Sequence, residues 1–472
     1  MANGRLLPIG GPEAVAGSIE DTFPCPSCGA QVTSYRALPK WCPACDWNLQ
    51  TVSALNVPGQ TGETLRPTDR LARERAEGLR AAILADPSVL ERLPPARDAL
   101  AIAAITNSFS IASFFAGMAL IVLFGGFIGI LFGLFLVAGG LRTFVHLRRL
   151  PSGHQRLTRS SLPETFALLD EICAELAVNP PKTIELTKEH RIEGEYRLRG
   201  SSLHVGVPLV RHLSGDELCA SLTQAIAALG FRSGPVSWFV ENARRSLRQL
   251  SEFLNEPTEI HAPDLLTSPV TLSGSVNGSQ VRMTIFAELL INAVRLIVRR
   301  PAEWLVSSFN ARSYRRNHLM AYRADAIAAR FTSPPAVVGA LSAEVLETSV
   351  RFAVQRRFLA PGLGAKIETP AQLWAEIEAH ARQLPGTEQL RLLRRSSLIG
   401  SSVDPELPPL GYRADILNVY RAPEPLGSGH TLSVSSDRYQ TIWSEIEVQS
   451  DRIADEFAGL FDRSLLRRSA AQ

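Results

Sequence analysis

The chain has 472 residues, a length that gives room for two or three domains. Its net charge of +3 is too small to indicate nucleic-acid binding, so no nucleic acid partner is expected. Only four of its 49 basic residues are lysines, and this arginine bias, together with abundant alanine, is typical of a GC-rich bacterial genome.

The strongest local signal lies in residues 21–50, which follow a Gly- and Pro-rich segment, 1–20, predicted to be a disordered tail. Four cysteines have the spacing CxxC-x13-CxxC: Cys25, Cys28, Cys42 and Cys45. This spacing predicts a zinc ribbon, in which four thiolates hold one structural Zn²⁺ and leave no position for a catalytic water. Two disulfides or a redox-active pair are the alternatives. A redox motif rarely comes as a matched pair, and the topology predicted below places the segment in a reducing compartment.

Residues 51–98 are predicted to form a linker that ends in a juxtamembrane helix, and residues 99–146 a transmembrane hairpin. The 43 positions between Asp98 and Arg142 contain no charged residue. One span needs about 20 apolar residues, so this stretch fits two helices, while a single long helix is the alternative. The approximate spans are Ile105–Phe124 and Phe127–His146, joined at Gly125 and Gly126.

Arginines flank both ends of this hairpin and predict its orientation. Arg92 and Arg97 precede it, and several arginines from Arg142 onward follow it. Because positive charge favours the cytoplasmic side, both ends and both termini are expected there, in a multi-pass protein of the inner (cytoplasmic) membrane. The lipid bilayer is therefore an expected partner.

Residues 147–345 contain three predicted strands followed by a helix. The strand patterns are Thr183–Thr187, Glu193–Leu198 and Leu203–Val207, which are expected to form a small meander. Ser214 and Glu217 have the spacing of a capping box, so a helix is predicted to begin there. Its apolar residues recur at helical spacing and are expected to face a core.

The stretch GSSLHVGVPLVRHLSGDELCASLTQAIAALGF resembles the active-site entry of the integral-membrane zinc metallopeptidases of the HtpX and CAAX-prenyl-protease type. In that family a strand and an LSxxEL helix start lead into HExxH, whose two histidines bind zinc beside a general-base glutamate. The resemblance places Gln224 and Ala228 at the two histidines and Ala225 at the glutamate. All three metal-site functions are therefore absent from this helix.

Two further segments carry the same resemblance. NHLMAYRADAIAARF is similar to the family's Glu-x-x-Ala-Asp helix, with Ala321 at the third zinc ligand and Asp325 retained. VDPELPPLGYR is similar to Asp-x-His-Pro-Pro followed by Arg; it retains Asp404, Pro408, Pro409 and Arg413, has Leu407 at the histidine and carries one inserted residue. In the family the aspartate supports the metal site. Here Asp325 is expected to pair with an arginine or to accept backbone donors.

The resemblance implies an α+β, mostly helical fold. It consists of a zincin-like domain at 147–345 that lacks HExxH, with the zinc ribbon and hairpin before it and a helical extension of the same body, 346–472, after it. It also implies a catalytically inactive homologue: no enzyme, no catalytic zinc, and a membrane-anchored, cytosol-facing protein-binding or regulatory scaffold with an unidentified protein partner. The alternative is an active membrane-bound peptidase, HtpX-like in quality control, that uses an unrecognised site.

Two predictions concern the remaining helices. Thr284–Trp304 is apolar on one face but too charged for an ordinary span, so it is expected either to pack against the domain or to lie in the bilayer interface. Toward the C-terminus, helices are predicted at Gln372–Arg382, Thr387–Arg395 and Tyr439–Leu466.

Overall fold

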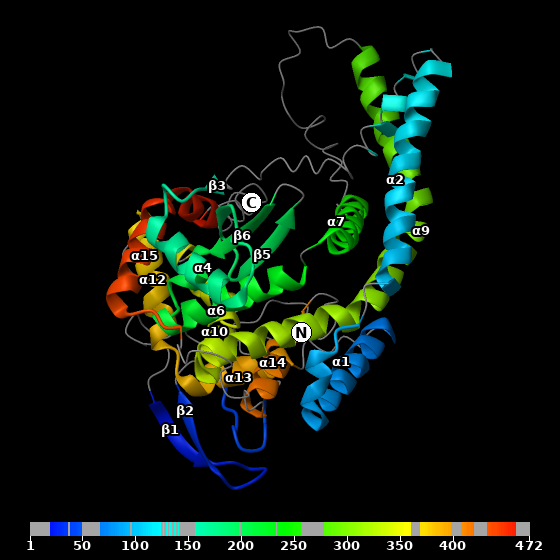
Figure 1. The fold of residues 1–472 in the computed structure, drawn as a ribbon. Helices are drawn as coiled ribbons and strands as arrows, with labels where there is room; N and C mark the ends of the chain where they lie inside the picture. Colours follow the sequence, from blue (N-terminus) through cyan, green and yellow to red (C-terminus); the bar gives the residue numbers. More distant parts are fainter. Residues whose placement is uncertain are drawn as a thin grey trace. The chain divides into compact units, whose positions relative to one another are not determined.

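The computed structural model describes residues 19–35, 38–49, 67–94, 97–123, 156–197, 200–232, 234–255, 278–359, 369–397, 407–419 and 432–458, with 126, 129–130, 132–134, 136–137 and 140. Most of the 1–20 tail and the linker up to Arg66 lie outside these residues. The described part is mostly helical with two small sheets (Figure 1).

The described chain forms two compact units. Unit 1 comprises residues 1–93, 149–233 and 317–472, and unit 2 comprises residues 94–148 and 234–316. The expected domain boundaries followed the order of the chain, whereas both units combine segments that are distant in sequence. The fold class agrees with the prediction at the level of a mostly helical chain with small sheets and a cysteine cluster near the N-terminus.

Unit 2 contains α2 (Arg97–Leu123), α7 (Pro235–Asn255), the first part of α9 (Gly278–Phe331) and helical residues between 129 and 140. Its small core consists of Ala99, Ile102, Ala103, Ala243, Leu247 and Phe309. Beside this core, the buried Asn242 amide donates to the Asn107 side chain at 3.1 Å, and Asn107 donates to the carbonyl of Phe239. A row of buried polar groups therefore joins α2 to α7.

Two predicted segments, Thr284–Trp304 and the helix containing Ala321, belong to one helix. The helix α9 runs without a break from Gly278 to Phe331. Pro301 lies inside this helix, although a proline more often marks a helix boundary because it lacks a backbone N–H.

Unit 1 contains a four-stranded sheet with the order β3-β4-β6-β5, of which β3, β6 and β5 are labelled in Figure 1. The strands are β3 (Arg156–Leu157), β4 (Thr183–Thr187), β5 (Ile192–Arg197) and β6 (Gly200–Gly206). The strands near the predicted positions are present, but the predicted meander is wrong, because β6 lies between β4 and β5 and runs parallel to β4.

The connection from β4 to β5 explains this order. It crosses the end of β6 at Gly206, whose N–H donates to the carbonyl of Arg191 at 3.0 Å. A Cβ at position 206 would lie 2.0 Å from the carbonyl oxygen of Glu189, so only glycine permits the crossing. The crossing holds residues 189–191 at one end of the sheet.

The central helix α6 (Gly215–Phe231) begins as the sequence predicts. Ser214 and Glu217 form the capping box, with the Ser214 N–H donating to the Glu217 carboxylate at 2.8 Å. The sheet and α4 (Pro163–Leu176) pack on this helix, and the buried residues of all three form one core. At Gly194 of β5 a Cβ would overlap the side chain of Leu229, so β5 approaches α6 closely.

Helices from distant parts of the sequence complete unit 1. They are α1 (Pro67–Ala85), η1 (Pro87–Glu91), α5 (Val207–Val210), the end of α9, α10 (Pro334–Glu344), α11 (Glu347–Leu359), α12 (Pro370–Gln383), α13 (Gly386–Ser396), α14 (Leu410–Val419), α15 (Ser436–Val448) and a helix at 451–458. The predicted helix Tyr439–Leu466 is interrupted. Gln449 ends α15, and buried Ser450 precedes the next helix while its hydroxyl accepts the indole N–H of Trp374 at 2.9 Å.

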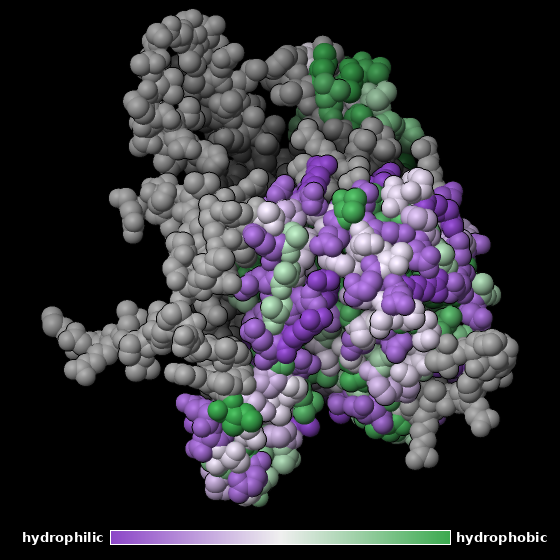
Figure 2. Space-filling model, turned by 90° about the vertical axis from the view of Figure 1, so that its left-hand side faces the viewer, coloured by the Kyte–Doolittle hydropathy of each residue, from purple (hydrophilic) through white to green (hydrophobic). Residues whose placement is uncertain are grey.

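One helix among the described residues is long and apolar enough to cross a membrane, by length and composition: Ala99–Leu123, within α2. Of the second predicted span, Phe127–His146, only some residues up to Gly140 are described, and all of these are helical. The described residues therefore do not support the multi-pass prediction. The described surface in Figure 2 is mostly hydrophilic, with one group of strongly hydrophobic residues at its upper edge.

Candidate metal centre and the junction at Asp325

The first cysteine pair lies on a tight turn after β1 (Ile19–Pro24) and before β2 (Gln31–Tyr35). The N–H of Cys25 donates to the carbonyl of Ala30, and the N–H of Gly29 donates back to the carbonyl of Cys25, both at 2.8 Å. Gly29 has a φ of +75°, which glycine adopts without strain. The N–H of Ser27 points at the Cys25 sulfur, 3.4 Å away.

The second pair repeats this turn in a different sequence. The N–H of Cys42 donates to the carbonyl of Trp47, and the N–H of Asp46 donates to the carbonyl of Cys42, both at 3.0 Å. Asp46 takes the place of Gly29 and has a φ of +58°. Aspartate tolerates this left-handed region better than most residues, so the second turn forms without a glycine.

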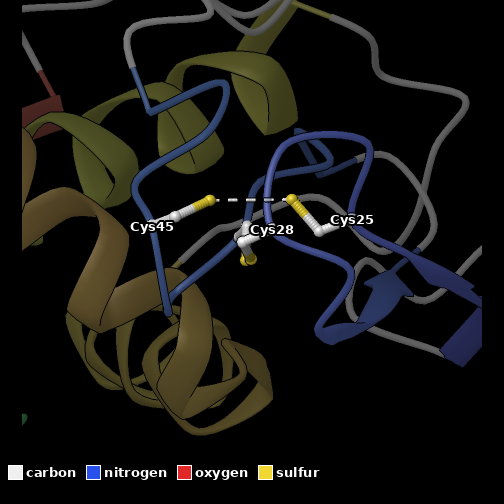
Figure 3. Close-up of side chains that lie close together, drawn as sticks. Cys25, Cys28 and Cys45 are labelled. Atoms are coloured by element: carbon white, nitrogen blue, oxygen red, sulfur yellow. Dashed lines mark hydrogen bonds between the residues drawn. The ribbon is translucent and has the colours of Figure 1, made fainter.

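The two turns bring all four thiols together. Their sulfur atoms lie within 4.8 Å of one another, with Cys25 and Cys45 at 3.6 Å and Cys28 and Cys42 at 3.7 Å. Figure 3 shows Cys25 and Cys45 pointing toward each other. A tetrahedral ion with bonds of about 2.3 Å to sulfur separates its ligands by about 3.7 Å. The donor set therefore fits a tetrahedral metal ion.

The cysteines of the cluster differ in how easily their thiols ionise. Burial opposes ionisation of Cys25, but N–H donors from Cys28 and Ser27 outweigh it and lower its pKa to about 7. The Ala30 N–H lowers the pKa of Cys28, yet the neighbouring cysteines outweigh it and raise that pKa to about 12. A bound metal ion would hold all four cysteines as thiolates, because its positive charge offsets the repulsion between them.

An arginine from the body of unit 1 holds the second turn. Arg394 on α13 donates to the carbonyl of Pro43 at 2.7 Å and to the carboxylate of Asp46 at 2.6 Å. Its guanidinium also lies over the ring of Trp41, with the central carbon 5.8 Å from the ring centre. The metal-binding turn is thus attached to α13.

The positions that the resemblance assigns to a lost catalytic site lie on α6 and α9. Ala225 and Ala321 are buried, Gln224 and Ala228 are half-buried, and none of these side chains can ligate a metal strongly. The amide nitrogen of Gln224 donates to the carboxylate of Asp325 at 2.9 Å. The structure therefore brings together the two predicted positions Gln224 and Asp325.

Arg413 also binds the carboxylate of Asp325, so Asp325 pairs with an arginine, one of the two arrangements expected for it. Its Nε donates to Asp325 Oδ2 at 2.8 Å and its Nη2 donates to Oδ1 at 2.6 Å, a two-point ion pair that is almost fully buried. Burial opposes the positive charge of Arg413, but the adjacent carboxylate outweighs burial and raises its pKa. We call Gln224, Asp325 and Arg413 the Asp325 junction.

A cavity of ≈ 470 Å³ lies beside the Asp325 junction. Three segments line it: the β4–β5 connection, the corner between α10 and α11, and the residues around the start of α14. The lining residues are Glu189, His190, Arg191, Glu344, Glu347, Arg351, Leu407, Pro408, Leu410 and Arg413. The resemblance had singled out Leu407, Pro408 and Arg413, but nothing in the sequence indicated the three glutamates.

Sequence reasoning also missed a pair of histidines. His190 and His212 are 22 positions apart, yet their ring centres lie 4.9 Å apart. The Nε2 atom of His190 is 3.0 Å from the carbonyl of Ala343, and that of His212 is 3.2 Å from the carbonyl of Ile377. No spacing on one helix could reveal them, because a strand connection and the end of α5 supply the two rings.

No family model matches this chain, and no curated protein or solved structure matches it either.

Proposed function

We propose that this chain is a membrane-anchored pseudo-metallopeptidase, a protease-like body that binds a protein partner on the cytosolic side of a bacterial inner membrane. In this proposal the chain descends from an HtpX-like metallopeptidase and has lost the residues that bind the catalytic zinc. The zincin-like fold of residues 147–345 and the absence of catalytic activity are parts of the same proposal.

The proposal rests mainly on the Asp325 junction. Gln224, Asp325 and Arg413 come from the three segments that resemble the family's motifs, and they are separated by 101 and 88 positions in the chain. Their side chains meet in one set of hydrogen bonds. Such a meeting is expected if the three segments descend from one active site, in which the amide and the guanidinium now satisfy the aspartate.

We assign the ion at the four cysteines to a structural zinc. All four donors are thiolates, which favour Zn²⁺ over harder cations, and four protein ligands leave no position for a reacting water. The zinc would stabilise residues 19–49, whose own buried cluster is small. Its role in the proposal is to keep this N-terminal segment folded and attached to α13.

The geometry of α2 supports the membrane anchor. Its exposed large apolar residues run from Ile105 to Leu123, about 27 Å at 1.5 Å per residue, close to the thickness of a bilayer core. A Cβ on Gly117 would lie 2.6 Å from the carbonyl oxygen of Gly133, and one on Gly140 would lie 2.7 Å from that of Ser110. Gly133 therefore lies against Gly117, and Gly140 lies against Ser110, which is earlier on α2. Because the residue number falls on α2 as it rises in the later segment, the two segments run antiparallel.

This close antiparallel packing is what a two-span hairpin with both ends in the cytoplasm would need. Small residues allow the two backbones to approach each other where side chains would separate them. Reporter fusions after residue 94 and after residue 155 test the topology. Both are expected to report the cytoplasmic side, and opposite sides would overturn the hairpin.

In-cell photo-crosslinking from cavity positions, followed by mass spectrometry, tests the binding function. A probe at Leu407 is expected to capture a specific protein, and a probe at exposed Val448 on α15 serves as the matched control. Casein and membrane-protein digestion assays are expected to show no cleavage. Cleavage that a Gln224 substitution abolishes would overturn the proposal in favour of an active peptidase.

A further inference from the structure

The cavity beside the Asp325 junction has the size of a small-ligand site. Its volume of ≈ 470 Å³ lies within the roughly 300–1,000 Å³ that is typical of such sites. Leu407, Pro408 and Leu410 provide an apolar wall, and the other lining residues are charged or imidazole side chains. An apolar wall with a few charged groups suits a ligand that has a hydrocarbon stem and a charged end.

Most of the charged groups in the cavity already have a partner. Arg191 pairs with Glu189 at 3.3 Å, and Arg351 pairs with Glu347 at 3.0 Å. Arg413 directs two nitrogens at Asp325. Each arginine is therefore neutralised, and an anionic ligand would have to break an existing ion pair to bind.

Glu344 differs from the other lining carboxylates. The closest cationic atom is Nη1 of Arg413, at 3.9 Å, which is beyond hydrogen-bond distance. Among the described residues, no side chain or backbone N–H donates to its carboxylate. About a quarter of its side chain is exposed (24%), so a ligand in the cavity can reach it. Glu344 is thus an open acceptor in a site where the arginines are occupied.

The surroundings of Glu344 favour an incoming positive charge. Burial raises the pKa of Glu344, and the attraction of Arg413 and Arg191 only partly offsets this effect, while the Asp325 carboxylate adds to it. A carboxyl group that resists ionisation gains stability when a cation is placed next to it. A ligand cation would therefore bind here without displacing any pair.

We propose that this cavity binds one basic side chain of a partner protein, with its ammonium or guanidinium group at the Glu344 carboxylate and its hydrocarbon stem against Leu407, Pro408 and Leu410. The inference rests on the proposed binding function, whose ligand class it names. Lysine and arginine share this chemistry, and an experiment can distinguish them. The recognition step is non-covalent and needs no cofactor.

Calorimetric titration of the full-length protein in lipid nanodiscs tests the inference. The probes are N-acetyl-arginine methylamide, N-acetyl-lysine methylamide and the neutral isostere N-acetyl-citrulline methylamide. At least one cationic probe is expected to bind about tenfold more tightly than the citrulline probe, because an ion-paired hydrogen bond is lost with the charge. Equal binding of all three probes, or no binding of either cation, would overturn the inference.

Matched variants locate the binding group. Glu344→Gln is expected to weaken the cationic probe about tenfold, whereas Glu344→Asp keeps a carboxylate and retains most of the affinity. Glu347→Gln is the control, because Glu347 is already paired with Arg351. Unaltered binding by a folded Glu344→Gln protein would contradict the assignment. If the unaltered protein still crosslinks a specific partner from Leu407 while neither cationic probe binds to it, the binding function stands and the inference fails.

Discussion

The side-chain amide of Gln224 donates to the carboxylate of Asp325 at 2.9 Å, and this hydrogen bond joins α6 to α9. The same carboxylate receives two donors from Arg413. Three donors on one buried carboxylate satisfy it without a metal ion. In the proposed function this contact replaces an active site by a structural junction.

Asp325→Ala is expected to destabilise unit 1 strongly. The substitution leaves Arg413 buried without its counter-charge, and removal of one partner of a buried ion pair costs about 3–5 kcal/mol. Asp415→Ala is the control, because Asp415 pairs with Arg80 at a partly exposed site and such pairs contribute about 1 kcal/mol or less. Urea unfolding followed by tryptophan fluorescence measures both. Similar losses for the two variants would contradict the structural role of the junction.

The double variant Asp325→Ala with Arg413→Met is a second test of this ion pair. Methionine removes the unpaired charge, so the double variant is expected to be more stable than Asp325→Ala alone. A further loss of stability in the double variant would show that Arg413 contributes mainly through contacts other than Asp325.

The purified protein is expected to contain about one zinc per chain. Changing Cys25 and Cys42 to serine leaves one thiolate in each pair and should remove the metal. Cys173→Ser with Cys219→Ser is the control, since these two cysteines are buried in the core around α4 and α6. Inductively coupled plasma mass spectrometry of the purified protein measures the zinc content per chain. A second tightly held zinc that survives loss of the four cysteines would favour an enzyme.

Arg394→Ala is expected to speed zinc transfer to a chelator about tenfold. Arg394 donates to the carbonyl of Pro43 and the carboxylate of Asp46, within the turn that carries Cys42 and Cys45. Residues that hold metal ligands in place typically change metal affinity by about 10–100-fold when they are lost. Arg382→Ala, on a mostly exposed side chain, is the control. Equal transfer rates in the two variants would show that the turn does not need α13.

Acid is expected to destabilise unit 1 partly through His190 and His212. Burial lowers the pKa of His190 to about 3, with further lowering from His212, and burial lowers the pKa of His212 to about 4. Both folded values lie below the unfolded value of about 6.5. The unfolded chain therefore binds more protons, and stability that is present above pH 6.5 is lost as the pH falls toward 4.

The double variant His190→Gln with His212→Gln isolates this contribution. Each histidine should contribute a slope of about 1.4 kcal/mol per pH unit between pH 6 and pH 4. The free energy of unfolding, measured in urea at several pH values, is expected to fall less steeply in the variant. Because other acidic groups act in both proteins, the difference between the two slopes is the quantity that decides. If the free energy of unfolding falls equally steeply with pH in both proteins, the two histidines do not contribute to the acid sensitivity.

Local patterns predicted the local features of this chain well. The capping box at Ser214 and Glu217, the positions of three strands and the spacing of the four cysteines all depend on neighbours in the sequence, and the structure contains them. The sheet order was predicted wrongly. It depends on the crossing at Gly206, where a glycine permits a contact with Glu189 that no periodicity of the strands indicates.

The sequence also predicted the candidate site only in part. From the sequence, Asp325 was expected to pair with an arginine or to accept backbone donors, and the arginine could be any of many. Only the packing of α14 against α10 and α13 places Arg413 within 2.6–2.8 Å of that carboxylate. The same packing creates the cavity with Glu344, whose sequence context shows nothing unusual.

By itself the sequence determined the metal-binding thiols, the apolar helix and the lack of metal ligands at Gln224, Ala225, Ala228 and Ala321, because residue chemistry and short-range spacing are written directly in the chain. The tertiary structure alone decided which residues face one another across long separations: Gln224 and Arg413 on Asp325, Arg394 on the metal-binding turn, and Glu344 in the cavity. Those contacts depend on how helices pack in three dimensions, and hydrophobic periodicity specifies which face is buried but not which partner covers it.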